Sequence, residues 1–274
     1  MGAVKMVGPM PQMGFGTWNR NGDEGYSSVM SALEVGYRHI DTAEGYRNEE
    51  FVGKAIAESG VPRHDVFLTT KVAPESYAPG QIMGHVKTSL DKLRTDKVDL
   101  LLLHWPSIKD KYDIKDYMAQ FAAVYDAGLS KHIGVSNFTK RYLDSAITLL
   151  DGRPITTNQC EIHVLMQNRI IVDYSATKGI PMTAYSPLAR GAVSQSDALR
   201  MIAGRYGATA EQIALALLMS QGHVVIPSSA RPDRIKSNFA AKDVALTTED
   251  VAAIRKLDEG RRLVDGDKCP KWDI

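Results

Sequence analysis

Four polar residues stand at or just past the ends of segments that read as buried strands. They are Asp41, Tyr46, Lys71 and His104. A lysine beside a tyrosine favours the phenolate and so makes the phenol a better proton donor, and an aspartate keeps the lysine charged and in place. Catalytic side chains collect at the carboxyl ends of strands in parallel α/β folds. We therefore expect these residues to form one site that protonates a carbonyl oxygen.

Each of the four residues also has an ordinary structural explanation when it is considered alone. A strand-end aspartate commonly caps a turn, a tyrosine fills a half-buried gap, a lysine carries surface charge, and a histidine is a satisfied core residue. Taken singly, these explanations are the better ones. The occurrence of all four at successive strand ends favours the catalytic interpretation instead.

Strand patterns alternate with helix patterns along the chain, and the connections between them are short. This alternation is typical of a parallel sheet wrapped by helices. Eight such units are expected, and they predict an α/β protein with a (β/α)8 TIM barrel whose site is built by the loops after the strands. The strands are expected at 13–17, 37–41, 66–71, 98–103, 132–135, 156–161, 181–185 and 223–226.

The helices that should surround this barrel show apolar residues at three- and four-residue spacing. Thr209 and Gln212 have the form of a capping box, in which each side chain bonds the backbone of the other residue, and they open one of the helices. The expected helices include 26–33, 49–58, 117–127, 169–178, 213–219 and a last helix from 248 to about 257.

Composition excludes several classes of function. The chain has 274 residues, of which 44% are hydrophobic and 24% charged, and this predicts one soluble globular domain over 1–274. The net charge of +1 gives no field for nucleic acid or an anionic membrane. The two cysteines, Cys160 and Cys269, cannot make a disulfide framework, which fits a reducing cytoplasm. With no long apolar run and no heptads, we expect no membrane span and a monomer.

Several cofactor and metal motifs are absent. No GxGxxG fingerprint follows the first expected strand, and no Walker, HExxH or CxxC pattern occurs. The seven histidines are scattered without the spacing of metal ligands. We therefore expect neither a doubly wound nucleotide domain nor a metal.

Seven strings along the chain, taken in order, resemble the aldo-keto reductase superfamily, and most of all its short bacterial members of the 2,5-diketo-gluconate reductase B type. The resemblance covers nearly the whole chain and implies the same barrel, with an amino-terminal hairpin before Met13 across its far end. The strings are GYRHIDTAEGYRNEEFVG at 36–53, LTTK at 68–71, LLHWP at 102–106, GVSNF at 134–138, TNQCEIH at 157–163, AYSPLARG at 184–191 and IPSSARPDRIKSN at 226–238.

The resemblance implies a nicotinamide cofactor held at the ends of the later strands. Tyr185 matches the tyrosine that stacks beneath the nicotinamide ring. Ser136, Asn137 and Gln159 match the residues that hydrogen-bond the carboxamide, which fixes the ring face that meets the substrate. Considered alone, each could equally make ordinary loop or strand-end hydrogen bonds.

The phosphate and adenosine contacts follow from the same resemblance. Leu188 and Gly191 match the loop that passes over the pyrophosphate. Ser229 and Arg234 match the residues that contact the 2′-phosphate, and Asn238 matches the residue that recognises the adenine. An arginine suits a phosphate because its planar fork donates two hydrogen bonds at once. The other expected cofactor contacts are Gly16, Thr17, Asp41, Ser186, Ile226, Ser228 and Arg231.

Two departures from the family pattern concern cofactor choice. Ser228 stands where many members have lysine, and Ser237 where many have glutamate. Arg231 is an additional phosphate candidate suggested by this sequence alone. We expect NADPH to be preferred, with weaker discrimination against NADH than a lysine-bearing relative would show.

The substrate pocket is expected to be wide on one side. Trp18 and Trp105 match aromatic positions that line the cleft, although either could serve simple core packing. Ala73 stands where many relatives have a tryptophan just after the catalytic lysine, so one wall should be missing. The tail after Leu257 is short, which implies a solvent-open mouth. Arg261 or Arg262 is a candidate contact for an acidic sugar.

The predicted function is NADPH-dependent reduction of aldehydes or ketones, with Tyr46 as proton donor and bulky or sugar-derived carbonyls as candidate substrates. One alternative is a regulatory protein that senses NADPH with little turnover, since related barrels serve as channel subunits. Another is a barrel enzyme of unrelated chemistry. The complete set of four polar residues favours the reductase.

Overall fold

The computed structural model describes residues 3–273 and contains eight parallel strands in one sheet. Each strand pairs with the next along the chain, and a parallel bridge between Met13 and Val225 joins the first to the last. The sheet thereby closes on itself, which confirms the (β/α)8 barrel. The strands are β3 Phe15–Gly16, β4 His39–Asp41, β5 Phe67–Val72, β6 Val98–Leu103, β7 Ser130–Ser136, β8 Ile155–Glu161, β9 Met182–Tyr185 and β10 Val224–Val225.

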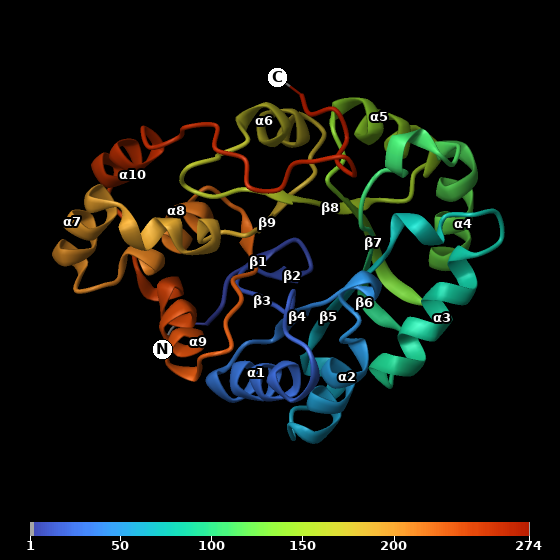
Figure 1. Cartoon of the computed structure of the whole chain (residues 1–274), viewed down its shortest axis with the longest axis horizontal. Coiled ribbons are helices and arrows are strands. Elements are labelled where there is room, and N and C mark those ends of the chain that lie inside the picture. The colour runs from blue at the N-terminus through green and yellow to red at the C-terminus, as the bar shows by residue number, and fades with distance from the viewer. Residues whose placement is uncertain (1–2, 274) are drawn as a thin grey trace.

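Helices form a ring around these strands (Figure 1). The capping box at Thr209 and Gln212 is present, with both reciprocal hydrogen bonds formed. The helices are α1 Gly22–Val35, α2 Glu49–Glu58, α3 Ile82–Leu93, α4 Ile114–Asp126, α5 Lys140–Leu149, α6 Arg169–Thr177, α7 Asp197–Tyr206, α8 Ala210–Ser220, α9 Pro232–Ala240 and α10 Thr248–Arg255.

Strand β6 shows how the strands fill both sides of the barrel wall. All of its residues are buried, as expected for a strand covered on both faces. Leu100 and Leu102 belong to an apolar cluster that includes Met10, whereas Leu101 and Leu103 belong to the larger cluster with the surrounding helices. Successive side chains therefore alternate between the barrel interior and the helical ring.

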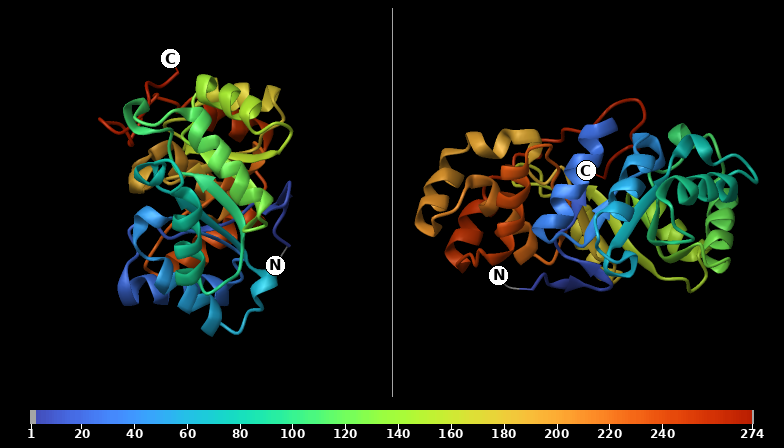
Figure 2. Two further views of the ribbon diagram at one scale, coloured as in Figure 1. Left: turned by 90° about the vertical axis from the view of Figure 1, so that its right-hand side faces the viewer. Right: turned by 90° about the horizontal axis from the view of Figure 1, so that it is seen from below.

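The amino-terminal hairpin closes one end of the barrel, as expected. Strands β1, Met6–Val7, and β2, Met10–Pro11, pair antiparallel. Met10 is fully buried in the interior cluster. The right-hand view of Figure 2 shows the hairpin at one edge of the molecule and the carboxyl-terminal tail at the opposite edge.

The join between the first and last strands requires a glycine. A Cβ built at Gly16 would lie 2.8 Å from the carbonyl oxygen of Ile226, a separation too short for a side chain. The amide of Gly16 instead donates to the carbonyl of Pro227 at 3.0 Å. The backbone contact at this join therefore depends on the absence of a side chain.

None of the helices within residues 3–273 has the length and apolar character needed to cross a membrane.

Candidate active site

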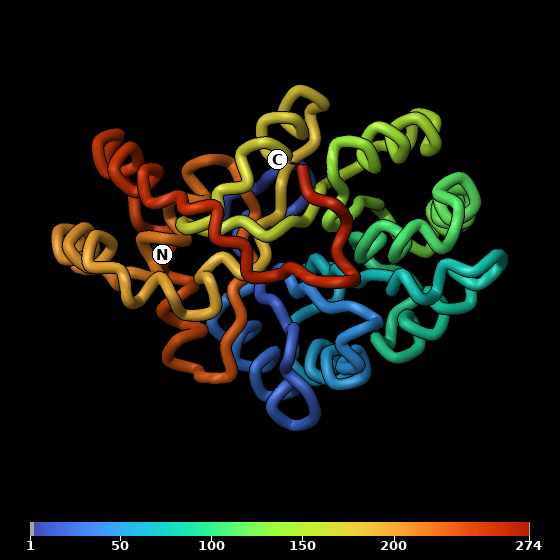
Figure 3. The backbone as a smooth tube through the Cα atoms, turned by 45° about the horizontal axis from the view of Figure 1, so that its top comes forward, coloured from blue at the N-terminus to red at the C-terminus, as the bar shows by residue number. Residues whose placement is uncertain are grey.

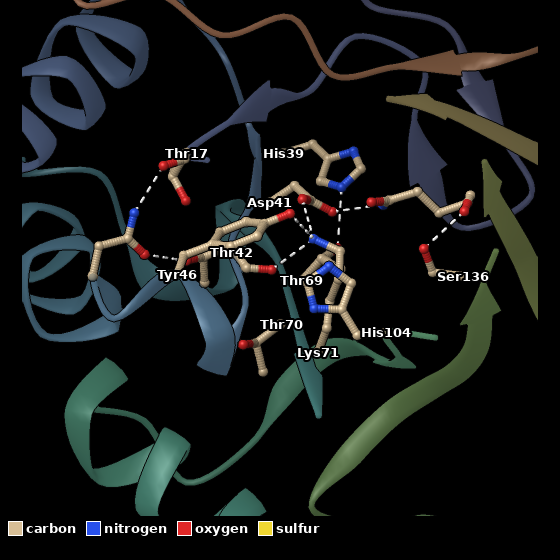
Figure 4. Close-up of polar contacts among 12 residues, drawn as sticks. Thr17, His39, Asp41, Thr42, Tyr46, Thr69, Thr70, Lys71, His104 and Ser136 are labelled. Carbon is tan, nitrogen blue, oxygen red and sulfur yellow. Dashed lines mark hydrogen bonds and ion pairs between the residues drawn. The ribbon is translucent and has the colours of Figure 1, made fainter. Parts of the chain in front are cut away.

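Three adjacent strands carry the four polar residues to one end of the barrel. Asp41 is the last residue of β4, and Tyr46 ends a short 3-10 turn that follows it. Lys71 lies on β5, and His104 comes directly after β6. Their side chains converge at the carboxyl ends of these strands (Figure 4). The structure therefore brings together the residues that the sequence predicted would meet.

The ammonium group of Lys71 is held by three hydrogen bonds. Its Nζ donates to Asp41 Oδ1 at 2.5 Å, to the carbonyl oxygen of Thr42 at 2.8 Å and to the Tyr46 hydroxyl at 3.3 Å. The side chains of Lys71 and Asp41 are 0% and 1% exposed. An ammonium has three N–H donors, so these partners fix its direction toward the phenol.

The buried charges act on the lysine and the tyrosine in different ways. Burial opposes the charge of Lys71, but Asp41 and Tyr46 together raise its pKa above the ordinary value. Burial raises the pKa of Tyr46, and the charge of Lys71 offsets this only in part. Lys71 therefore acts in the expected direction, toward a lower pKa of the phenol, but burial outweighs it and the net pKa of Tyr46 is raised. Tyr46 stays protonated and available as a donor.

His104 faces Tyr46 across the cavity floor. The two ring centroids lie 5.5 Å apart at an interplanar angle of 76°, an edge-to-face arrangement. Burial, together with the positive charge of Lys71, holds the pKa of His104 well below its usual value. The imidazole is therefore neutral and carries one N–H donor. Tyr46 and His104 can both donate to one oxygen placed between them.

Asp41, Tyr46 and His104 line one end of a large cavity of about 1240 Å³, and Lys71 is buried behind them. The cavity extends from this candidate catalytic floor to helix α9, which is more room than one small substrate fills. Most of the expected cofactor and substrate contacts line it. These are Gly16, Trp18, Asp41, Ala73, Trp105, Ser136, Asn137, Gln159, Tyr185, Ser186, Leu188, Gly191, Ile226, Ser228, Ser229, Arg234 and Asn238.

Two expected contacts, Thr17 and Arg231, do not line this cavity. Thr17 is fully buried behind its wall, where its amide donates to the carbonyl of Asp41 at 2.9 Å. The guanidinium of Arg231 is exposed and pairs with Asp233 at 2.6 Å. Asp233 itself lines the cavity, so Arg231 lies beside the cavity without forming its wall, and both assigned contacts stay predictions.

Hydrogen bonds between side chains fix the positions expected to meet a carboxamide. The Tyr185 hydroxyl donates to Asn137 Oδ1 at 2.9 Å, and Asn137 Nδ2 donates to the carbonyl of His104 at 3.1 Å. Gln159 Nε2 donates to Asp41 Oδ2 at 2.8 Å. The amide groups beside the catalytic floor are thus held in set orientations. The amide oxygen of Gln159 remains as an acceptor in the cavity wall.

Comparison with known proteins decides the family. The sequence profile of the Aldo/keto reductase family matches residues 12–259, which is most of the chain. The chain belongs to the aldo/keto reductase family. It is therefore an oxidoreductase, and its family supports a nicotinamide cofactor and carbonyl reduction.

Relatives of this aldo/keto reductase agree over nearly its full length. It is 42% identical to the methylglyoxal reductase DkgB of Escherichia coli O157:H7 over 265 residues, covering 96% of this chain and 99% of the relative. It is 40% identical to the methylglyoxal reductase DkgA of Yersinia pestis, covering 93% and 91%. A crystal structure assigned provisionally as 2,5-diketo-D-gluconic acid reductase B superposes with a TM-score of 0.93 at 41% identity, covering 97% and 94%.

The aldo/keto reductase cavity also contains two arginines that the sequence reasoning missed. Arg20 lines the wall and its Nε donates to Ser228 Oγ at 3.4 Å. The guanidinium of Arg190 lies 5.4 Å from the ring centroid of Trp18. Arg20 follows the predicted contact Trp18 by two positions, and Arg190 directly precedes Gly191. This closeness in sequence was the only indication that they would line the cavity.

The carboxyl-terminal tail forms part of the aldo/keto reductase cavity. Residues 264–269 line the cavity, and Figure 3 shows the tail crossing the end of the barrel. Glu161, at the end of β8, accepts the amides of Leu263 and Val264 at 2.7 and 2.9 Å. Neither Arg261 nor Arg262 lines the cavity; Arg262 packs over Trp272.

Metal ligands are not grouped in the described part of this aldo/keto reductase. Between residues 3 and 273, no three histidine, cysteine or acidic side chains are arranged to hold an ion. Cys160 is buried and Cys269 half-buried, and both are free thiols.

Proposed function

We propose that this aldo/keto reductase reduces aldehydes and ketones to alcohols with NADPH, using Tyr46 as the proton donor. The observation that carries the proposal is the buried Lys71 ammonium, which contacts the Tyr46 hydroxyl beside a neutral His104 at the floor of the large cavity. Two donors directed at one position suit a carbonyl oxygen that gains negative charge during reduction.

The cavity residues fit a nicotinamide dinucleotide. Tyr185 offers a flat ring, and Asn137 and Gln159 offer amide groups held by their neighbours. Arg234 and Ser229 lie in the wall beside helix α9 and suit a phosphate. When bound, the cofactor supplies the hydride. We propose that NADPH is preferred and that NADH is used more weakly.

The side chains then supply the proton and hold the carbonyl. His104 donates its ring N–H to the substrate oxygen and orients it. Tyr46 gives its proton to this oxygen as the carbonyl carbon is reduced, which leaves a phenolate. Lys71 stabilises the phenolate through the 3.3 Å contact, and Asp41 keeps the lysine charged.

The substrate class is proposed from the cavity and the relatives. The DkgB and DkgA relatives are named methylglyoxal reductases, so a small dicarbonyl is one candidate. Ala73 leaves space beside the catalytic floor, which would also admit bulky or sugar-derived carbonyls. We propose further that the enzyme acts as a single-domain monomer in the cytoplasm.

Replacing Tyr46 with phenylalanine tests the proton donor. Tyr46→Phe should lower kcat for aldehyde reduction by about 10²- to 10⁴-fold, because general acid catalysis contributes that much. Tyr125→Phe is the matched control, since Tyr125 lies on helix α4 away from the cavity. Parent-like turnover by purified Tyr46→Phe would show that another group donates the proton.

A cofactor-sensing role is the second candidate, and the same assay separates the two. Steady NADPH oxidation on addition of aldehydes supports the enzyme. Tight NADPH binding without turnover over a broad carbonyl panel would favour the sensor. Absence of an NADPH-induced fluorescence change or thermal shift would instead point to unrelated chemistry.

A further inference from the structure

A carboxylate next to the proposed proton donor has three hydrogen-bonding partners. Glu44 stands two residues before Tyr46 in the same 3-10 turn. Its Oε2 accepts the amide of Ala73 at 2.9 Å, and its oxygens lie 3.1 and 3.2 Å from Ser76 Oγ. Its Oε1 lies 2.5 Å from His85 Nδ1 on helix α3. We refer to Glu44, Ala73, Ser76 and His85 as the Glu44 cluster.

The Glu44 cluster joins two loops that both contribute to the cavity. Gly45 and Tyr46, on one loop, line the cavity, and so do Ala73 and Pro74 on the loop after β5. Glu44 itself does not line it. The carboxylate therefore acts from behind the wall. It links the turn that carries the proton donor to the loop that forms the side of the substrate pocket.

Two side chains connect these loops in different ways. Lys71 donates a hydrogen bond to the Tyr46 hydroxyl at 3.3 Å, and this is the longest of the three hydrogen bonds of its ammonium group. The main-chain carbonyl of Glu44 accepts the amide of Arg47 at 3.1 Å within the turn that carries Tyr46, and the side chain of Glu44 accepts the amide of Ala73. A bond to a backbone amide fixes the loop itself. Glu44 thus constrains where the phenol stands relative to Ala73.

We propose that Glu44 is a positioning residue that sets the distance between the Tyr46 hydroxyl and the substrate wall at Ala73. The proposal rests on the proposed role of Tyr46 as proton donor. The Glu44 side chain is 19% exposed, so its bonds are partly shielded from water. Without it, the amide of Ala73 would lose its partner and both loops would gain freedom. Misplacement of a reacting group by about 1 Å can lower a rate about a hundredfold.

Glu44→Ala and Glu44→Gln give the direct test. Glu44→Ala should lower kcat for a small aldehyde by about ten- to a hundredfold and leave the Kd for NADPH unchanged, because the cluster lies beside the catalytic floor. Glu44→Gln keeps one acceptor oxygen for the amide of Ala73 and should recover most of the rate. Glu58→Ala is the matched control: Glu58 accepts from Tyr26 on the exposed surface, outside the cavity.

A positioning role predicts a pattern that general destabilisation does not. In Glu44→Ala the ratio of kcat/KM between a bulky cyclic ketone and a small aldehyde should change, since the wall at Ala73 moves relative to Tyr46. Unchanged kcat and an unchanged ratio, with only a lower Tm, would overturn the proposal, and so would equal losses in rate and NADPH affinity.

His85→Ala keeps the proposal testable if Glu44→Ala does not fold. Removing this single partner should lower kcat about threefold with unchanged NADPH affinity. Parent-like kcat in His85→Ala and Glu44→Gln alike would overturn the proposal. Failure of the proposed function is distinguishable, because either the parent enzyme would show no turnover or Tyr46→Phe would keep the parent rate.

Discussion

Substitution of Ala73 by tryptophan should convert the wide pocket into a narrow one. Ala73 lines the cavity next to the catalytic floor, and its φ of −71° and ψ of 144° suit any residue. Tyr77 does not fill the space beside it, because its hydroxyl donates to the carbonyl of Trp105 at 2.9 Å and its ring is fully buried. Trp18 is 53% exposed and pairs with Arg190. The indole therefore has room to project into the cavity.

The expected size of the effect follows from how strongly a binding pocket discriminates between substrates of different size. Filling a pocket usually changes transition-state binding by about 1–3 kcal/mol, which is roughly 10- to 200-fold in kcat/KM. The loss should fall on bulky cyclic ketones and spare small aldehydes such as methylglyoxal. The assay is NADPH oxidation with both substrate classes, reported as the ratio of their kcat/KM values. Ala57→Trp, at an exposed position on helix α2, controls for the added indole.

Two results would refute this reasoning. An unchanged ratio would mean that the loop after β5 does not meet the substrate. Equal losses on large and small substrates would mean general damage around Lys71, because a steric wall must act selectively.

Cofactor choice and pH response give the remaining predictions. Arg20→Gln should weaken NADPH binding by about tenfold and leave NADH binding nearly unchanged if the guanidinium of Arg20, beside Ser228, meets the 2′-phosphate. Fluorescence titration of both cofactors checks this, with Arg231→Gln as the control because Arg231 does not line the cavity, and equal weakening of both would place Arg20 at the pyrophosphate instead. The lowered pKa of His104 keeps its imidazole neutral as the pH falls through about 6.5, the usual pKa of a histidine. The pH profile of kcat/KM for reduction should therefore show no inflection there, and a clear inflection between about pH 6 and 7 would contradict this.

The sequence predicted secondary structure best where burial alone decides it. The expected strand 98–103 and helix 49–58 match β6 and α2. A run that is apolar apart from Asp99 and a clear helical period can both be recognised without knowledge of the elements that pack against them. The first strand was expected at 13–17, but β3 covers only Phe15–Gly16. Its length depends on backbone bonds across the join with β10, and those are set by closure of the barrel.

Helix α9 shows a second limit of the sequence reasoning. It was not among the expected helices, because only Ile235, Asn238 and Phe239 are buried in its nine residues. Ile235 and Phe239 lie one helical turn apart, so the stretch offers only a single repeat of the helical spacing.

The candidate site was predictable in its residue types but not in its side-chain directions. The tail follows its path because Glu161 accepts amides 102 and 103 positions further along the chain, which no local pattern reveals. The net rise in the pKa of Tyr46 has the same origin. A neighbouring lysine is visible in sequence motifs, whereas the degree of burial that outweighs it is not.

The ion pair between Lys71 and Asp41 also affects how this enzyme can change by mutation. Both side chains are almost wholly withdrawn from water, so removal of either alone leaves the other charge buried and unpaired. Such a loss costs about 3–5 kcal/mol. Whole proteins have only about 5–15 kcal/mol of net stability. Single substitutions at this pair therefore threaten folding as well as chemistry. A descendant that lost catalysis but kept the barrel would reach that state more readily through Tyr46 or His104, or by replacing both charges together.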